Sequence, residues 1–117
     1  MSALAASTGR ITTHALDTAT GRPCAGLHIV LSRLDAPDTP LGRFVTNADG
    51  RCDGPLLAGE AVIAGAYELV FHVGAWRDGA PGFYDEIPIR FRIEDPGAHH
   101  HVPLILSPFG YTTYRGS

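Results

Sequence analysis

Hydrophobic residues occupy every second position in several short runs of this chain, a pattern typical of β-strands with one buried face. The clearest run is residues 87–93, whose alternate apolar side chains are Ile87, Ile89, Phe91 and Ile93. Similar runs, bounded by glycine and proline, predict strands at residues 10–16, 26–34, 42–46, 67–73, 87–93, 99–106 and 111–114. One short helical turn is expected at residues 75–78. The predicted fold is all-β, a sandwich of two sheets with one short helix.

The length of the chain and its turns indicate a single domain. A chain of 117 residues can bury one hydrophobic core without disulfides or a structural metal. We expect residues 10–117 to form this domain and residues 1–9 to be a flexible N-terminal tail. The sequence Asn47-Ala48-Asp49-Gly50 predicts a tight turn, because glycine readily adopts a positive φ. This turn delivers Arg51 to the start of the next segment.

The charge balance argues against nucleic acid and membranes as partners. The chain contains 9 Lys+Arg against 12 Asp+Glu, a formal net charge of -3. No apolar run is long enough to span a membrane, and residues 1–9 lack the regions of a signal peptide. The simplest location is therefore the cytoplasm.

The two cysteines, Cys24 and Cys52, have no metal-binding or redox spacing, so we expect two reduced thiols. Arg51 precedes Cys52, and a neighbouring guanidinium would lower the pKa of that thiol. This single neighbouring charge is a weak sign of a nucleophile.

Three of the histidines are consecutive, at residues 99–101. In a strand, His99 and His101 share one face, whereas His100 points to the other face, where the core is expected. Periodicity alone does not decide which face of the first strand, including His14, is buried. A His-x-His pair on a strand can bind a metal. No third ligand stands at a diagnostic spacing, so the prediction is that no metal site exists.

The chain ends with Tyr114-Arg115-Gly116-Ser117, which places a phenol, a guanidinium and a hydroxyl beside the terminal carboxylate. Only the short turn at residues 107–110 separates this segment from the preceding strand. We therefore expect the chain end to be held in the fold, with its polar groups available to a ligand.

Three segments together resemble the transthyretin-related family of 5-hydroxyisourate hydrolases. They are residues 12–17 with Gly21-Arg22-Pro23, residues 46–51, and residues 95–117. A terminal Tyr-Arg-Gly-Ser is specific to these enzymes, and the thyroid-hormone carriers of the same superfamily lack it. The positions that depart from the family pattern are Ala15, Cys24 and His100.

The resemblance implies a transthyretin-like sandwich that assembles as a homotetramer, a dimer of dimers, with the active sites in clefts between dimers. It also implies hydrolysis of 5-hydroxyisourate, the product of urate oxidation, to 2-oxo-4-hydroxy-4-carboxy-5-ureidoimidazoline on the route to allantoin. No cofactor is implied. The catalytic positions of the family carry over to His14, Arg51, His101 and Ser117. The substrate-binding positions carry over to His14, Arg51, Tyr114 and Arg115.

These residue types suit the hydrolysis of an amide, which needs an activated water, a stabilised oxyanion and a proton for the departing nitrogen. Our hypothesis is that His14 activates water, Arg51 holds the anionic ring, and His101 orients or protonates the departing nitrogen. Tyr114 and Ser117 would position substrate and water. Which histidine is the base stays open at this stage. The alternatives are a small-ligand carrier of the same fold that does not turn over its ligand, and an inert interaction module.

Overall fold

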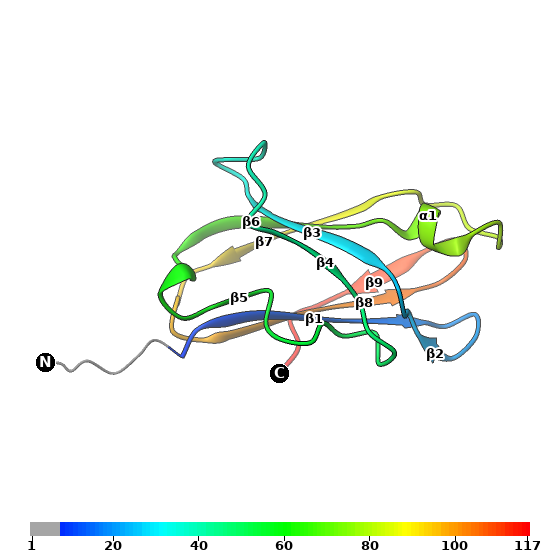
Figure 1. The fold of residues 1–117 in the computed structure, drawn as a ribbon, viewed down its shortest axis with the longest axis horizontal. Helices are drawn as coiled ribbons and strands as arrows, with labels where there is room; N and C mark the ends of the chain where they lie inside the picture. The colour runs from blue at the N-terminus through cyan, green and yellow to red at the C-terminus, as the bar shows by residue number, and fades with distance from the viewer. Residues whose placement is uncertain (1–7) are drawn as a thin grey trace, which may run out of the picture.

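A computed structural model describes residues 8–117, which fold into two β-sheets packed face to face (Figure 1). The strands in chain order are β1 (Arg10–Asp17), β2 (Arg22–Pro23), β3 (His28–Arg33), β4 (Gly42–Val45), β5 (Leu57–Ala58), β6 (Gly65–Phe71), β7 (Ile87–Ile93), β8 (His99–Leu106) and β9 (Tyr111–Thr113). A 3-10 turn, η1 (Gly59–Ala61), and one helix, α1 (Val73–Arg77), complete the described elements. The prediction of an all-β sandwich with one short helix is confirmed.

One sheet has the strand order β2-β1-β8-β9, with β5 paired to β1, and the other has the order β4-β3-β6-β7. Figure 1 shows these sheets as two layers, with α1 at one end of the β6 and β7 layer. β1 and β8 run parallel, although they are far apart in the sequence. Such a pairing brings residues from the start and the end of the chain onto one surface.

The core lies between the two sheets and follows the predicted alternation. Ile87, Ile89 and Ile93 are buried, whereas Arg90 and Arg92 are exposed. The largest fully buried side chains come from both layers and include Tyr67, Phe71, Ile11, Leu27, Ile29 and Leu104. Packing of these apolar faces fixes the register of each strand, because a slip of one residue would turn the apolar set toward solvent.

The predicted boundaries of the helix are wrong, those of the strands predicted at residues 26–34 and 67–73 are wrong by up to two residues, and three other strands end one residue away from the prediction. The helix spans Val73–Arg77 instead of residues 75–78, so Val73 begins a helix where the alternation predicts a strand. Asp78 ends the helix in a left-handed conformation with φ of 48°. The strand predicted at residues 26–34 is shorter, His28–Arg33. The strands β2 and β5 have only two residues each, too few to show a periodic pattern.

The chain near the N-terminus is attached to the sandwich from Thr8 onward. The Thr8 hydroxyl donates to the carbonyl of Gly97 at 2.8 Å, and the N–H of Gly59 donates to the carbonyl of Gly9 at 2.9 Å. Of the tail predicted at residues 1–9, residues 1–7 lie outside the described residues. Within residues 8–117, no helix has the length and apolar character needed to cross a lipid bilayer.

Candidate active site

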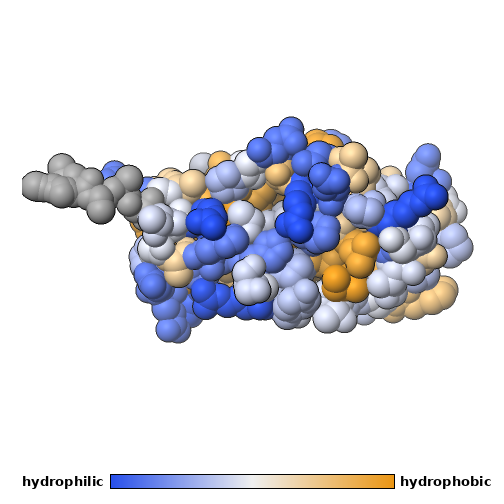
Figure 2. All heavy atoms as spheres, turned by 90° about the horizontal axis from the view of Figure 1, so that it is seen from below, coloured by the Kyte–Doolittle hydropathy of each residue, from blue (hydrophilic) through white to orange (hydrophobic). Residues whose placement is uncertain are grey.

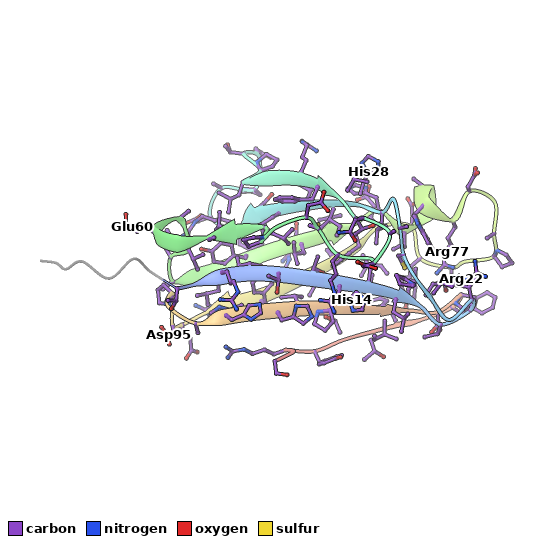
Figure 3. All side chains as sticks on the ribbon, turned by 60° about the horizontal axis from the view of Figure 1, so that its bottom comes forward. His14, Arg22, His28, Glu60, Arg77 and Asp95 are labelled. Atoms are coloured by element: carbon purple, nitrogen blue, oxygen red, sulfur yellow. The ribbon has the colours of Figure 1, made fainter. Side chains whose placement is uncertain are left out.

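The outer face of the β1–β8 pair carries His14, whose orientation the sequence left open, together with His99 and His101. Along β1, Ile11, Thr13 and Ala15 are buried, whereas Thr12 and His14 are half-buried on the opposite face. This pattern places His14 outside the core, and Figure 3 labels it midway along β1. The ambiguity about His14 is therefore resolved in favour of the outer face.

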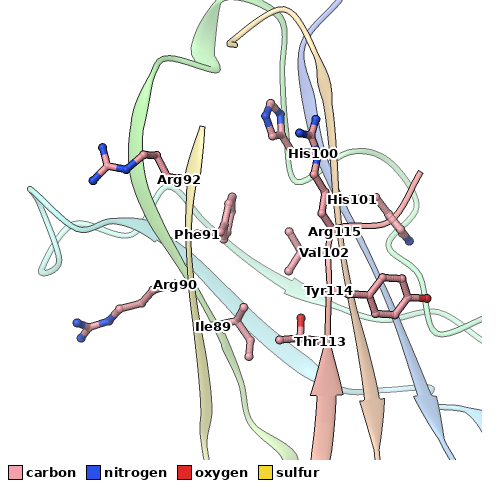
Figure 4. Close-up of a pocket in the computed structure, with 10 residues that line it drawn as sticks. All are labelled: Ile89, Arg90, Phe91, Arg92, His100, His101, Val102, Thr113, Tyr114 and Arg115. Atoms are coloured by element: carbon pink, nitrogen blue, oxygen red, sulfur yellow. The ribbon is translucent and has the colours of Figure 1, made fainter. Parts of the chain in front are cut away.

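On β8 the alternation is as predicted. His100 is 5% exposed and lies on the core side, while His99 and His101 are half-buried on the outer face. In the parallel register, Thr12 is the partner of His101. Figure 4 shows His100 and Val102 pointing to one side of β8 and His101 pointing to the other.

Thr12 connects the two outward histidines of β8. Its Oγ1 lies 2.6 Å from Nε2 of His99 and 2.8 Å from Nδ1 of His101. Both distances are those of hydrogen bonds. The two rings have centroids 6.0 Å apart and are tilted by 55°. Thr12 is therefore hydrogen-bonded to the two nitrogen atoms, one on each ring, through which the His-x-His pair would bind a shared metal ion.

The loop that carries Arg51 is attached to β1 beside His14. The carboxamide oxygen of Asn47 accepts hydrogen bonds from the N–H groups of Asp49 and Arg51, which closes the predicted turn. The carbonyl of Gly50 then accepts a 2.9 Å hydrogen bond from the N–H of Ala15. Gly50 has φ of 72°, and a Cβ there would collide with the carbonyl oxygen of Ala15. Only glycine allows this close approach.

The C-terminal segment returns to β8 after β9. The N–H of Gly116 donates a 2.8 Å hydrogen bond to the carbonyl of His101, and these two residues form an isolated β-bridge. A guanidinium nitrogen of Arg115 donates to the carbonyl of His99 at 3.2 Å. The expectation that the chain end is held in the fold is confirmed by these contacts.

Three of the predicted site residues meet in one polar cavity of about 270 Å³. Arg51, His101 and Ser117 line it, together with Thr12, Thr13, Cys52, Gly54 and His99. His14 does not line this cavity, although it is near enough to Arg51 and His101 to interact with them electrostatically. The cavity joins β1, β8, the Arg51 loop and the chain end.

Tyr114 and Arg115 lie beside a second cavity, of about 260 Å³. Its other lining residues include Ile89, Phe91, Val102 and Thr113, so it is more apolar than the first (Figure 4). His101 lines both cavities. The two predicted substrate-binding residues of the chain end are thus next to His101 but outside the Arg51 cavity.

The imidazoles of the site are held in their neutral forms. Burial lowers the pKa of His101 below 6.5, and the positive charge of Arg51 lowers it further, followed by His99 and His14. Burial and Arg51 also lower the pKa of His14, and a hydrogen bond with the main chain of Asp49 partly opposes this. A neutral imidazole near pH 7 can accept a proton, while the guanidinium of Arg51 stays cationic.

The cysteines do not have the character of nucleophiles. Cys24 is fully buried, and this burial raises its pKa to about 12. Burial, and then the charge of Asp53, also raise the pKa of Cys52, so the suggested activation by Arg51 is wrong. Both cysteines are free thiols, as predicted. Among residues 8–117, no group of three or more His, Cys, Asp and Glu side chains is arranged to hold a metal ion.

The sequence motifs assign no role to Thr12 and indicate His99 only as a possible metal ligand. The signal for both was present in the period-two pattern, because Thr12 precedes His14 by two residues and His99 precedes His101 by two. The pattern does not show that β1 pairs with β8 in parallel, and this pairing is what makes Thr12 the neighbour of His101.

The two-sheet sandwich is of the transthyretin-like class, because solved transthyretin structures share its fold. Residues 11–116 match the family described as HIUase/Transthyretin family, and the chain belongs to this family. It is 55% identical over 116 residues to the 5-hydroxyisourate hydrolase of Mesorhizobium japonicum, with 93% of each chain covered. The family identified from sequence motifs is therefore confirmed.

Solved structures agree with this assignment. The structure of the 5-hydroxyisourate hydrolase of Klebsiella pneumoniae matches with a TM-score of 0.80 and 38% identity over 92% of this chain and 99% of that one. An (S)-allantoin synthase matches with a TM-score of 0.86 and 42% identity over 95% of this chain, which spans only 46% of that longer chain. Sea bream transthyretin in complex with thyroxine is 26% identical, with a TM-score of 0.82, over 92% of this chain and 94% of that one.

Proposed function

We propose that this protein is an enzyme that hydrolyses 5-hydroxyisourate to 2-oxo-4-hydroxy-4-carboxy-5-ureidoimidazoline. The observation that carries the proposal is the polar cavity in which Arg51, His101 and Ser117 meet, with His14 close to two of them. The named relatives with the same fold and 38–55% identity support the choice of substrate. This reaction consumes a product of urate oxidation, so the enzyme would act in the degradation of purines.

The geometry suggests a division of roles among these residues. Arg51 is a permanent cation in the cavity, so it would hold the anionic ring and stabilise the oxyanion that forms when water adds to the carbonyl. His14 and His101 are neutral near pH 7 and would receive a proton from water and return one to the departing nitrogen. Ser117 lines the same cavity and would position water or substrate. Tyr114 and Arg115 would bind the substrate from the chain end beside His101, where Arg115 is hydrogen-bonded to the carbonyl of His99.

The proposal includes a homotetramer, a dimer of dimers, in which residues 10–117 of each chain act as one domain. β7 and β9 are edge strands of the two sheets, and edge strands are available for pairing with another chain. Figure 2 shows the face at the bottom of Figure 1 as mostly hydrophilic, with a compact hydrophobic area that a second dimer would cover. Light scattering should then give a mass four times the 12.4 kDa of the chain. We place this enzyme in the cytoplasm.

A carrier of small ligands is the main alternative, because sea bream transthyretin has the same fold and binds thyroxine. A cavity with a guanidinium, imidazoles of lowered pKa and a terminal serine favours chemistry on an anionic substrate over storage of an apolar ligand. The two functions differ in whether the ligand is consumed.

The reaction itself provides the test. We would generate 5-hydroxyisourate from urate with urate oxidase, add this protein, and follow the products by carbon-13 NMR. The proposal predicts that the ring-opened product accumulates at a rate proportional to protein concentration. Thyroxine binding at micromolar affinity without any consumption of 5-hydroxyisourate would instead establish the carrier.

A further inference from the structure

The hydroxyl of Thr12 is the one side-chain group hydrogen-bonded to His101 in the described part of the chain. It holds Nδ1 of that ring at 2.8 Å, and its second contact is Nε2 of His99 at 2.6 Å. A threonine hydroxyl has one proton to donate and lone pairs to accept with. It can therefore donate to one of these imidazoles and accept from the other, which couples the tautomers of the two rings.

Two arrangements in which Thr12 donates to one ring and accepts from the other satisfy both contacts; in a third, both rings donate to the lone pairs of the hydroxyl, and His101 then carries its proton on Nδ1. In the first, Nδ1–H of His101 donates to Thr12, whose hydroxyl donates to His99, and Nε2 of His101 keeps its lone pair. In the second, the directions are reversed, and His101 carries its proton on Nε2. The first arrangement makes His101 a base toward the cavity, and the second makes it a hydrogen-bond donor.

The surroundings favour the first arrangement. His101 and Arg51 line the same cavity, and a guanidinium offers only N–H donors. Because Thr12 occupies Nδ1, Nε2 is the nitrogen that remains available to this cavity. A lone pair there is attracted to the guanidinium, whereas a second N–H would be repelled by it.

We infer that Thr12 and His99 are positioning residues that hold His101 as its Nδ1–H tautomer, so that Nε2 of His101 is the general base of the site. This inference rests on the proposed hydrolase function and adds to it. A base that is oriented by a third group is a recurrent arrangement in hydrolytic sites. Here the third group is a neutral hydroxyl backed by an imidazole.

The charged groups around the pair are consistent with this role. Burial lowers the pKa of both rings most, and the charged neighbours add to it: Arg51, His99 and His14 for His101, and Arg10, His100 and Arg115 for His99. All of them lower these pKa values, so both rings stay neutral near pH 7. The neutral forms are those that the hydrogen-bonded chain through Thr12 requires.

In the proposed reaction, Nε2 of His101 takes a proton from water and later returns it to the departing nitrogen. The water oxygen bonds to the substrate carbonyl carbon, one water proton moves to Nε2 of His101, and the carbonyl electron pair moves to its oxygen near Arg51. The imidazolium formed still donates from Nδ1 to Thr12. Collapse re-forms the carbonyl, breaks the bond from carbon to nitrogen, and returns the proton from Nε2 to the departing nitrogen.

The kinetic test compares Thr12→Val, which removes the hydroxyl, with Thr12→Ser, which keeps it. We expect Thr12→Val to lower kcat at least tenfold with little change in KM, and Thr12→Ser to restore kcat to within about threefold of wild type. Thr39→Val is the matched control, because Thr39 is exposed on the loop between β3 and β4. Wild-type kcat in Thr12→Val at every pH would overturn the inference.

His99→Ala gives an independent measure of coupling. If Thr12 and His99 act as a unit, the variant that combines Thr12→Val with His99→Ala should have a kcat no lower than that of the less active single variant. Losses that multiply in the double variant would contradict the joint role.

Nitrogen-15 NMR of the imidazoles tests the tautomer without relying on activity. Above its pKa, His101 of the wild type should be the Nδ1–H form, and Thr12→Val should shift it toward a mixture. A wild-type Nε2–H tautomer would overturn the inference even in an active enzyme. A protein inactive toward 5-hydroxyisourate that shows the expected tautomers would instead refute the proposed function and leave the positioning pair standing.

Discussion

Replacing Gly116 with alanine should damage the site through a single added methyl group. A Cβ at this position would lie 2.5 Å from Cδ2 and 3.2 Å from Cγ of His101. Carbon atoms in favourable contact are about 3.5–4.0 Å apart, so the ring and the chain end must separate by about 1 Å. The chain end cannot move freely, because the N–H of Gly116 is hydrogen-bonded to the carbonyl of His101 at 2.8 Å.

The size of the effect follows from that displacement. A misplacement of about 1 Å at a reacting group can cost about 10²-fold in rate. Moving the ring also disturbs the 2.8 Å contact between His101 and Thr12. We therefore expect kcat of Gly116→Ala to fall about 10²-fold. The core between the sheets is untouched, so the melting temperature should stay close to that of the wild type.

The assay is the initial rate of 5-hydroxyisourate consumption, measured with a thermal unfolding scan of each variant. Gly110→Ala is the matched control, since a Cβ at Gly110 meets no atom within 4 Å. It should retain the wild-type rate. A Gly116→Ala enzyme with wild-type kcat would refute the claim that the ring of His101 must keep its position against the chain end.

Other predictions follow from the charges and burial of the site. Arg51→Ala should lower kcat by about 10²-fold or more, because the cation that faces the oxyanion is lost, and a raised KM with unchanged kcat would disprove this role. Since the pKa values of His14 and His101 are lowered, the acid limb of kcat/KM should lie below pH 6.5, and Arg51→Ala should move it to higher pH. Just below pH 6.5 the folded protein binds fewer protons than the unfolded chain, because the pKa values of these histidines are lowered on folding. The free energy of unfolding should therefore be highest above pH 6.5 and fall as the pH falls. Denaturant titrations at several pH values measure this free energy. Cys24, whose pKa is raised to about 12, should resist alkylation at pH 8 in the native protein and react after unfolding, and rapid native labelling detected by mass spectrometry would contradict its burial.

The sequence predicted the layers of the fold well because the core is periodic. Strands such as β7 alternate cleanly, and burial of every second residue determines which face is inside. The strand ends were less predictable. Val73 continues the apolar alternation of β6, but in the structure it is the first residue of α1. The next residue, Gly74, donates its N–H to the carbonyl of Asp85 at 2.7 Å, a contact with a distant segment that the local alternation does not encode.

The candidate site was predictable only in part, and for a related reason. The faces of His100 and His101 follow from alternation within β8, and Arg51 follows from its turn. The position of Thr12 beside His101 depends on a parallel pairing between residues almost ninety positions apart, which no local pattern encodes. The motif resemblance supplied the set of residues, and the structure shows which of them line one cavity.

The ultraviolet decay of 5-hydroxyisourate, with and without this protein and its His101→Ala variant, tests the central claim most directly. We predict that the wild type accelerates the decay far above the spontaneous rate and that the variant loses at least 10²-fold of this acceleration. A wild-type protein that leaves the spontaneous rate unchanged would contradict the hydrolase function. A fully active variant would contradict the role assigned to His101.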